Sequence, residues 1–193
     1  MTTETTTSPE RAKAQEYLTT RAEAMTPQQI RARMRAAVVE LDAAVDGVSQ
    51  QASLQVVVPG QWTIAQVVDH VAQGTIRVAD ELRCLIEGRT PPAVPVYEGI
   101  VSGAAHRVPF GELLQGMRAA NAEVDALLGR AIESEPPAGA TARTILVFNR
   151  ADGTEEFFDM HLTWKGYAMC QRLHLLDHRT QIKKLRDAQG RQG

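Results

Sequence analysis

The chain is poor in cysteine and in long apolar stretches, and its charges nearly balance; each shortage excludes a class of protein. Its 193 residues include two cysteines, Cys84 and Cys170, too few and too far apart for a disulfide-stapled secreted domain. No apolar run approaches the roughly 20 residues that a membrane-spanning helix needs. A formal net charge of -2 provides no basic surface for nucleic acid. We therefore expect a cytoplasmic protein without membrane or nucleic-acid partners.

Several catalytic motifs and targeting signals are also missing. The sequence has no glycine-rich phosphate-binding loop, no dinucleotide fingerprint and no Gly-x-Ser-x-Gly nucleophile elbow. Residues 1–7 are rich in threonine, and we expect them to be disordered. They lack the basic and apolar regions of a signal peptide. A chain of this length can bury one substantial core, which favours a single domain. Any chemistry must then come from another kind of site.

The spacing of apolar residues predicts four main helices. Their expected ranges are 26–48, 63–88, 110–132 and 163–187. The first two open with a capping box, in which Thr26 or Thr63 is followed three residues later by glutamine. This pattern predicts an all-α fold, a four-helix bundle. The expected organisation is a polar tail with a short helix at 1–25, the bundle at 26–188 and a C-terminal tail at 189–193.

Two segments break the helical pattern. Residues 88–109 contain four prolines and three glycines, and so long a connection would let the third helix run parallel to the second. Residues 143–162 combine a β-rich run with the turn pair Asp152-Gly153 and then alternate apolar with polar residues. We predict a small β-hairpin there. The alternative is an early start of the last helix, from Glu155.

Three histidines fall where a metal ion could be held. His174 and His178 are four residues apart in the last helix, which places their Cβ atoms roughly 6 Å apart on one face. His70 lies beside the apolar stripe of another core helix. A single helical histidine is more often structural, but three neutral imidazoles with one position left open make a catalytic type of metal site. We therefore predict a divalent metal centre at His70, His174 and His178.

Other polar residues near these histidines leave alternatives open. Leu175 stands where a zinc protease carries its catalytic glutamate, and Asp177 points about 100° away from His178, so the protease motif is absent. Asp69 would supply charge behind the ligands, although acidic residues are common on the shoulders of helices. Gln181 would either orient a ligand or substrate, or make a buried polar contact within the bundle.

Three further residues are weaker candidates as metal ligands. Cys170 and His178 lie about 12 Å apart along the helix, so one ion cannot readily use both, and Cys170 is expected to be a small buried residue. His106 belongs to the long connection and His161 to the expected hairpin, and neither has a spacing argument. Tyr97 and the loop around it would overhang the metal.

The sequence resembles the DinB-like (DinB/YfiT) superfamily over residues 26–188. The matching features are Trp62-Thr63-Ile64 leading to His70, the run His174-x-x-x-His178-Arg179-x-Gln181, the order of the helices and the long second-to-third connection. Two positions depart from the pattern. Asp177 stands where many relatives carry histidine, and Thr180 where many carry glycine. Neither departure removes a ligand.

The resemblance implies an up-down-down-up four-helix bundle, often homodimeric, with nickel, zinc or iron held by His70, His174 and His178. Members with known activities use the metal to activate a low-molecular-weight thiol, such as bacillithiol or mycothiol, for transfer or isomerisation. We therefore expect a metal-dependent thiol S-transferase or hydrolase that acts on a small molecule. One alternative is a non-catalytic stress-response protein in which the ion is structural. Another is an empty site, with its histidines hydrogen-bonded in the core.

Overall fold

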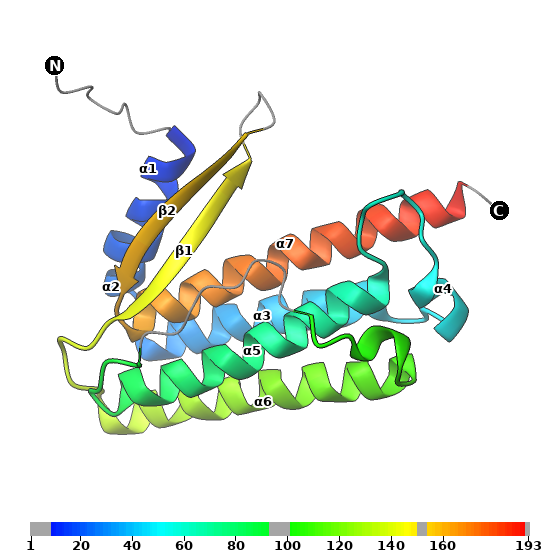
Figure 1. Ribbon diagram of the computed structural model, residues 1–193. Helices are drawn as coiled ribbons and strands as arrows, with labels where there is room; N and C mark the ends of the chain where they lie inside the picture. Colours follow the sequence, from blue (N-terminus) through cyan, green and yellow to red (C-terminus); the bar gives the residue numbers. More distant parts are fainter. Residues whose placement is uncertain (1–8, 93–100, 150–153, 192–193) are drawn as a thin grey trace, which may run out of the picture.

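The computed structural model describes residues 9–92, 101–149 and 154–191. Within these ranges the protein is mostly helical, and a two-stranded antiparallel hairpin precedes the last helix (Figure 1). None of the described helices is long and apolar enough to cross a lipid bilayer. Three expectations concern residues outside the described ranges: the disordered stretch 1–7, the overhanging Tyr97 and the turn at Asp152-Gly153.

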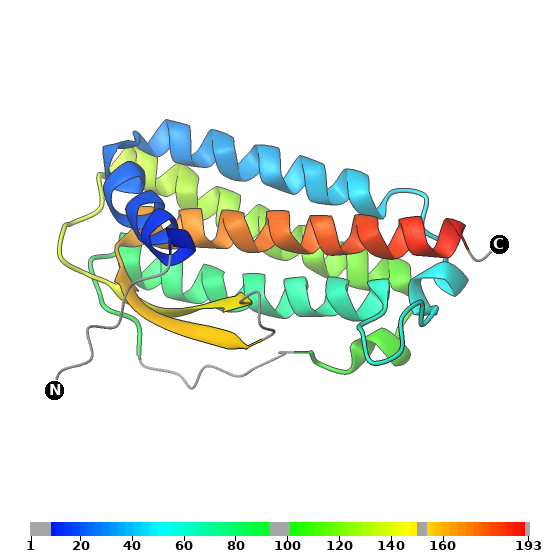
Figure 2. The same cartoon turned by 90° about the horizontal axis from the view of Figure 1, so that it is seen from above.

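Four long helices make up most of the structure. They are α3 (Pro27–Val45), α5 (Ile64–Ile86), α6 (Phe110–Ser134) and α7 (Trp164–Gly190). Helix α5 packs against both α6 and α7, and α3 packs against the same two helices. Followed by colour in Figures 1 and 2, α3 and α7 run in one direction and α5 and α6 in the other. Consequently α5 ends at the opposite end of the molecule from the start of α6.

The helix starts follow from local hydrogen bonding. The Thr26 hydroxyl accepts from the Gln29 N–H at 3.2 Å, and the Gln29 side chain accepts from the Thr26 N–H at 2.9 Å. Thr63 and Gln66 repeat this exchange at 3.3 and 2.9 Å. Each box pairs amide groups that the first helical turn leaves without a partner. The two predicted capping boxes are confirmed.

Glycines in the left-handed conformation follow the ends of α3 and α5. Helix α3 ends at Val45, three residues before the expected position, and Gly47 follows with a φ of 69°. A short helix that the sequence analysis did not anticipate, α4 (Gln50–Leu54), begins after Ser49 as its N-cap. Gly88, with a φ of 74°, follows the end of α5. Such φ values cost glycine little, because it has no Cβ.

The predicted hairpin is confirmed. Strand β1 (Ala142–Asn149) pairs antiparallel with β2 (Glu155–Leu162), so the last helix does not begin early. Phe158 and Met160 are buried, whereas the intervening Asp159 is exposed, as expected for a strand with one face against the core. The hairpin occupies the connection between α6 and α7 and lies beside the N-terminal helices in Figure 1.

The N-terminal segment packs more closely than a polar tail would. It comprises α1 (Pro9–Glu16), the π-helical turn η1 (Tyr17–Arg21) and α2 (Ala22–Ala24). Leu18 and Ala22 are fully buried in the core. A Cβ atom on Gly166 of α7 would lie only 2.4 Å from the carbonyl oxygen of Leu18, so the two backbones can approach this closely only at glycine.

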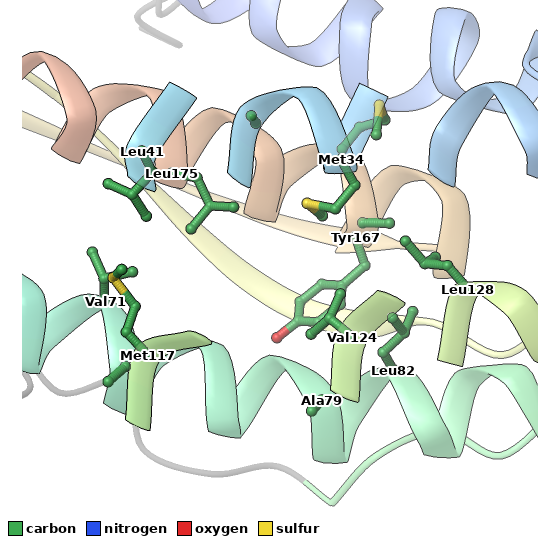
Figure 3. Packing of buried hydrophobic residues seen from close by; sticks show 14 of the residues in the cluster. Met34, Leu41, Val71, Ala79, Leu82, Met117, Val124, Leu128, Tyr167 and Leu175 are labelled. Carbon is green, nitrogen blue, oxygen red and sulfur yellow. The ribbon is translucent and has the colours of Figure 1, made fainter. Parts of the chain in front are cut away.

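The four long helices share one apolar core. Figure 3 shows side chains from all four of them packed together, including Met34, Leu41, Val71, Leu82, Met117, Leu128 and Leu175. Leu41, Val71, Met117 and Leu175 are almost completely removed from solvent. Burial of Leu175 fixes the rotation of α7 about its own axis, and with it the direction of the neighbouring His174.

Candidate metal centre

Three histidine side chains meet between α5 and α7. His70 lies near the N-terminal end of α5, and His174 and His178 lie one turn apart in α7. Val71 and Leu175, the residues that follow two of these histidines, are fully buried and hold both helices in place. His178 is buried, whereas His70 and His174 are partly exposed. The cluster therefore borders the core and still reaches solvent.

The Nε2 atoms of the three rings point toward one another. Nε2 of His174 lies 3.0 Å from Nε2 of His70 and 3.0 Å from Nε2 of His178. An ion bonded at about 2.1 Å to two nitrogens with this separation would make an N–metal–N angle of about 90°. Tetrahedral geometry at that bond length would need nitrogens about 3.4 Å apart. These two separations thus match neighbouring ligands of an octahedral ion better than those of a tetrahedral one.

The protein environment keeps two of these rings neutral. The pKa of His174 is held well below its usual value by burial, and a charge there would also be repelled by His178 and His70. Burial likewise lowers the pKa of His178, although its hydrogen bond to Gln181 acts in the opposite direction. Metal ions bind the neutral imidazole, so these shifts leave the nitrogen lone pairs available at neutral pH.

Two neighbouring side chains support the ligand rings. The Oε1 atom of Gln181 lies 2.8 Å from Nδ1 of His178, on the side of the ring away from the cluster. The ring of Trp62 packs against His70, with the ring centroids 4.9 Å apart and the planes inclined by 48°. Trp62 is itself partly buried. Both contacts restrict how the imidazoles can rotate.

His174 is positioned differently, by packing. Among the described residues its Nδ1 atom is buried and has no hydrogen-bond partner. Gly74 of α5 faces the ring: a Cβ atom at this position would lie 3.3 Å from Cε1 of His174. Since that is closer than almost all real Cβ contacts, the missing side chain of Gly74 provides the space for the imidazole. No pattern of residues around Gly74 indicates this role.

The two aspartates that neighbour the ligands are not members of the cluster. The Asp69 carboxylate is buried and accepts two hydrogen bonds from Ser102, from the backbone N–H at 2.8 Å and from the hydroxyl at 2.7 Å. It therefore ties the α5–α6 connection to α5, immediately beside His70. Asp177 is exposed. The hydrogen bonds of Ser102 to Asp69 could not be predicted from local sequence, because the two residues lie 33 positions apart.

The weaker candidates lie apart from the cluster that the described residues form. Cys170 is partly buried, its sulfur lies 3.9 Å from the Thr144 hydroxyl, and burial raises its pKa to about 11. A thiol with such a pKa stays protonated at neutral pH and is a poor ligand and nucleophile. His106 is exposed in the short 3-10 helix η2 (Ala104–His106), and His161 is exposed on the hairpin.

A row of buried polar pairs continues from the histidines along the contact between α5 and α7. The Gln171 amide donates to the Thr75 hydroxyl at 2.9 Å. Further along, the Tyr167 hydroxyl donates to Glu81, which also accepts from Arg77 at 2.7 Å. Because buried polar groups need partners, each of these polar side chains of α7 is matched by a polar side chain of α5.

Comparisons of the chain with protein-family models, with curated proteins and with solved structures found no match. Function therefore has to be inferred from the histidine cluster and its surroundings. Three imidazole nitrogens lie close enough together to hold one metal ion.

Proposed function

We propose that this protein is a metal-dependent enzyme with a DinB-like, up-down-down-up four-helix bundle. In this proposal His70, His174 and His178 hold one divalent ion, which is nickel, zinc or iron. The observation that supports it most is the convergence of three Nε2 atoms from two helices, with two of the side chains partly exposed. The directions of the long helices are those that such a bundle requires.

A bound divalent ion would supply Lewis-acid chemistry by lowering the pKa of a thiol or water in an open position. The protein binds and orients this ion through imidazoles that stay neutral. No carboxylate or cysteine of the described residues joins the cluster, so we assign no side chain as a general base. The reaction we propose is thiol S-transfer or hydrolysis on a small molecule in the cytoplasm, with a low-molecular-weight thiol as co-substrate for the transfer.

The rival hypothesis is a non-catalytic protein in which the ion only holds α5 and α7 together. A structural site normally closes its remaining positions with further protein ligands. In the described part of the chain, the cluster contains three histidines and no fourth ligating side chain. The partial exposure of His70 and His174, which leaves the cluster within reach of solvent, favours the catalytic hypothesis. We extend the proposal to a homodimer, which members of the DinB-like superfamily often form.

The first test is the metal content of protein purified without a histidine tag, beside His70→Ala and His178→Ala variants. We expect about one equivalent of a first-row transition metal in the wild type and its loss from both variants, because two imidazoles hold an ion less tightly than three. A wild type that takes up no zinc, nickel or iron would refute the metal centre. Full metal content in His178→Ala would refute the three-histidine ligand set.

Protein loaded with metal is then screened with thiols and small electrophiles. Disappearance of the free thiol, dependent on the ion and on His70, is the expected result. If an ion binds tightly but neither thiol transfer nor hydrolysis occurs, and its removal lowers the unfolding temperature, the structural hypothesis replaces the enzyme. These outcomes separate the existence of the site from its use.

A further inference from the structure

The side chain of Gln181 makes a directed contact with one of the three histidines. Gln181 lies three residues after His178 on α7, and its Oε1 atom is 2.8 Å from Nδ1 of His178. An amide oxygen only accepts hydrogen bonds, so Nδ1 must carry the ring proton in this contact. The lone pair of the neutral ring then resides on Nε2, the atom that faces the other two histidines.

This proton placement is not the one that a free imidazole prefers. A neutral histidine side chain in water favours the tautomer with its proton on Nε2, and a hydrogen bond at one nitrogen decides the tautomer in a protein. Without an acceptor at Nδ1, His178 would therefore direct an N–H group into the cluster instead of a lone pair. A ring in that state must change tautomer before it can bind an ion.

The other ligand of α7 lacks such a partner. In the described part of the chain, Nδ1 of His174 is buried and accepts or donates no hydrogen bond. Within the pair supplied by this helix, Gln181 is thus the hydrogen-bonding support, whereas His174 depends on packing against Gly74. The two ligands are held by different physical means and respond to different substitutions.

We propose that Gln181 is a positioning residue that fixes the tautomer and the rotation of His178, and thereby sets the metal affinity of the site. This inference rests on the proposed function, because it assumes that His178 binds an ion. It goes further in assigning a role to a side chain outside the ligand set. Partners of this kind, behind metal-bound histidines, change metal affinity by about 10–100-fold when they are removed.

The test compares Gln181→Leu and Gln181→Glu with a control, Gln189→Leu. Gln189 lies on the same helix and its amide also makes one hydrogen bond, 2.7 Å to the carbonyl oxygen of Ala52. Dissociation constants for Ni²⁺ and Zn²⁺ are measured by competition with a coloured chelator on otherwise intact protein. We expect binding about 10–100-fold weaker in Gln181→Leu and unchanged in Gln189→Leu. Gln181→Glu should bind at least as tightly as the wild type, because a carboxylate is a stronger acceptor.

A second measurement reads the tautomer without any metal. Long-range ¹H–¹⁵N correlation spectra of the metal-free protein distinguish a protonated from an unprotonated ring nitrogen. We expect His178 to be protonated on Nδ1 in the wild type and in Gln181→Glu, and on Nε2 in Gln181→Leu. Protonation on Nε2 in the wild type would overturn the inference, since the Gln181 amide would then be donating.

The outcomes separate this inference from the proposed function. Wild-type affinity in Gln181→Leu, or affinity as weak in Gln181→Glu as in Gln181→Leu, would overturn the role of Gln181 while the metal centre stands. A wild type that binds neither ion would overturn both. Equal losses of unfolding free energy in the two leucine variants, with no change in the dissociation constants, would reduce Gln181 to an ordinary structural contact.

Discussion

Replacing Gly74 with alanine should separate the stability of α5 from the geometry of the metal centre. Gly74 lies inside α5, where alanine is favoured over glycine by about 0.8–1.0 kcal/mol of helix propensity. The new Cβ atom, however, would lie 3.3 Å from Cε1 of His174. Relief of that contact moves the ring by a few tenths of an ångström, on the order of the ±0.2 Å tolerance of metal–ligand distances. The same methyl group thus favours the helix and disfavours the site.

Gly116→Ala is the matched control. Gly116 lies inside α6, and a Cβ atom there would have no other atom within 4 Å. We expect this variant to gain about 0.8–1.0 kcal/mol in unfolding free energy without any change in metal affinity. Gly74→Ala should gain less, because the contact with His174 offsets part of the propensity. Its metal affinity should fall roughly tenfold, the lower end of what the loss of a supporting residue costs.

Urea denaturation of the metal-free proteins and chelator competition measure the two quantities separately. The reasoning is refuted if Gly74→Ala gains as much stability as Gly116→Ala and binds metal as tightly as the wild type. That result would mean that His174 has room to spare on the side of α5. Weaker metal binding in Gly116→Ala would instead show that the assay responds to the fold in general.

Two further predictions concern buried groups between α5 and α7. The metal-free protein should lose stability as the pH falls below about 6.5, because unfolded histidines take up protons there while folded His174 and His178, with lowered pKa values, do not. The unfolding free energy should change by up to about 1.4 kcal/mol per pH unit for each of the two histidines. Urea denaturation at several pH values should show a smaller pH dependence in a variant with both residues changed to asparagine. The same pH dependence in that variant and in the wild type would contradict the argument. Tyr167→Phe should cost about 1–3 kcal/mol in unfolding free energy, since Glu81 loses a buried donor, and a loss below the error of urea denaturation would show that Glu81 is satisfied without it.

Local signals predicted most of the helices and the members of the histidine cluster. Capping boxes at Thr26 and Thr63 marked helix starts, because they act within four residues of chain. The pair His174 and His178 needed only helical periodicity. That His70 would meet them was an inference from amphipathic faces, and the structure confirms that the three side chains lie together.

The features that the sequence did not reveal depend on contacts between distant elements. Nothing in the neighbourhood of Gly74 indicates that an imidazole from α7 will lie against it. Ser102 stands in a connection without regular periodicity, so its two hydrogen bonds to Asp69 had no local signature. The N-terminal segment has a thin apolar face, and its packing depends on the close approach allowed by Gly166.

The contact between the N-terminal segment and α7 also governs when the chain can finish folding. The Lys165 ammonium group donates to the carbonyl oxygens of Glu23 and Met25, at separations in sequence of 142 and 140 residues. A ribosome releases the N-terminal segment well before α7, so Leu18 is made long before the helix that it packs against. Closing such distant contacts is slow, and exposed apolar residues aggregate or recruit chaperones in the meantime. A chain whose synthesis stops before α7 would lack the helix against which Leu18 and the rest of the N-terminal segment pack.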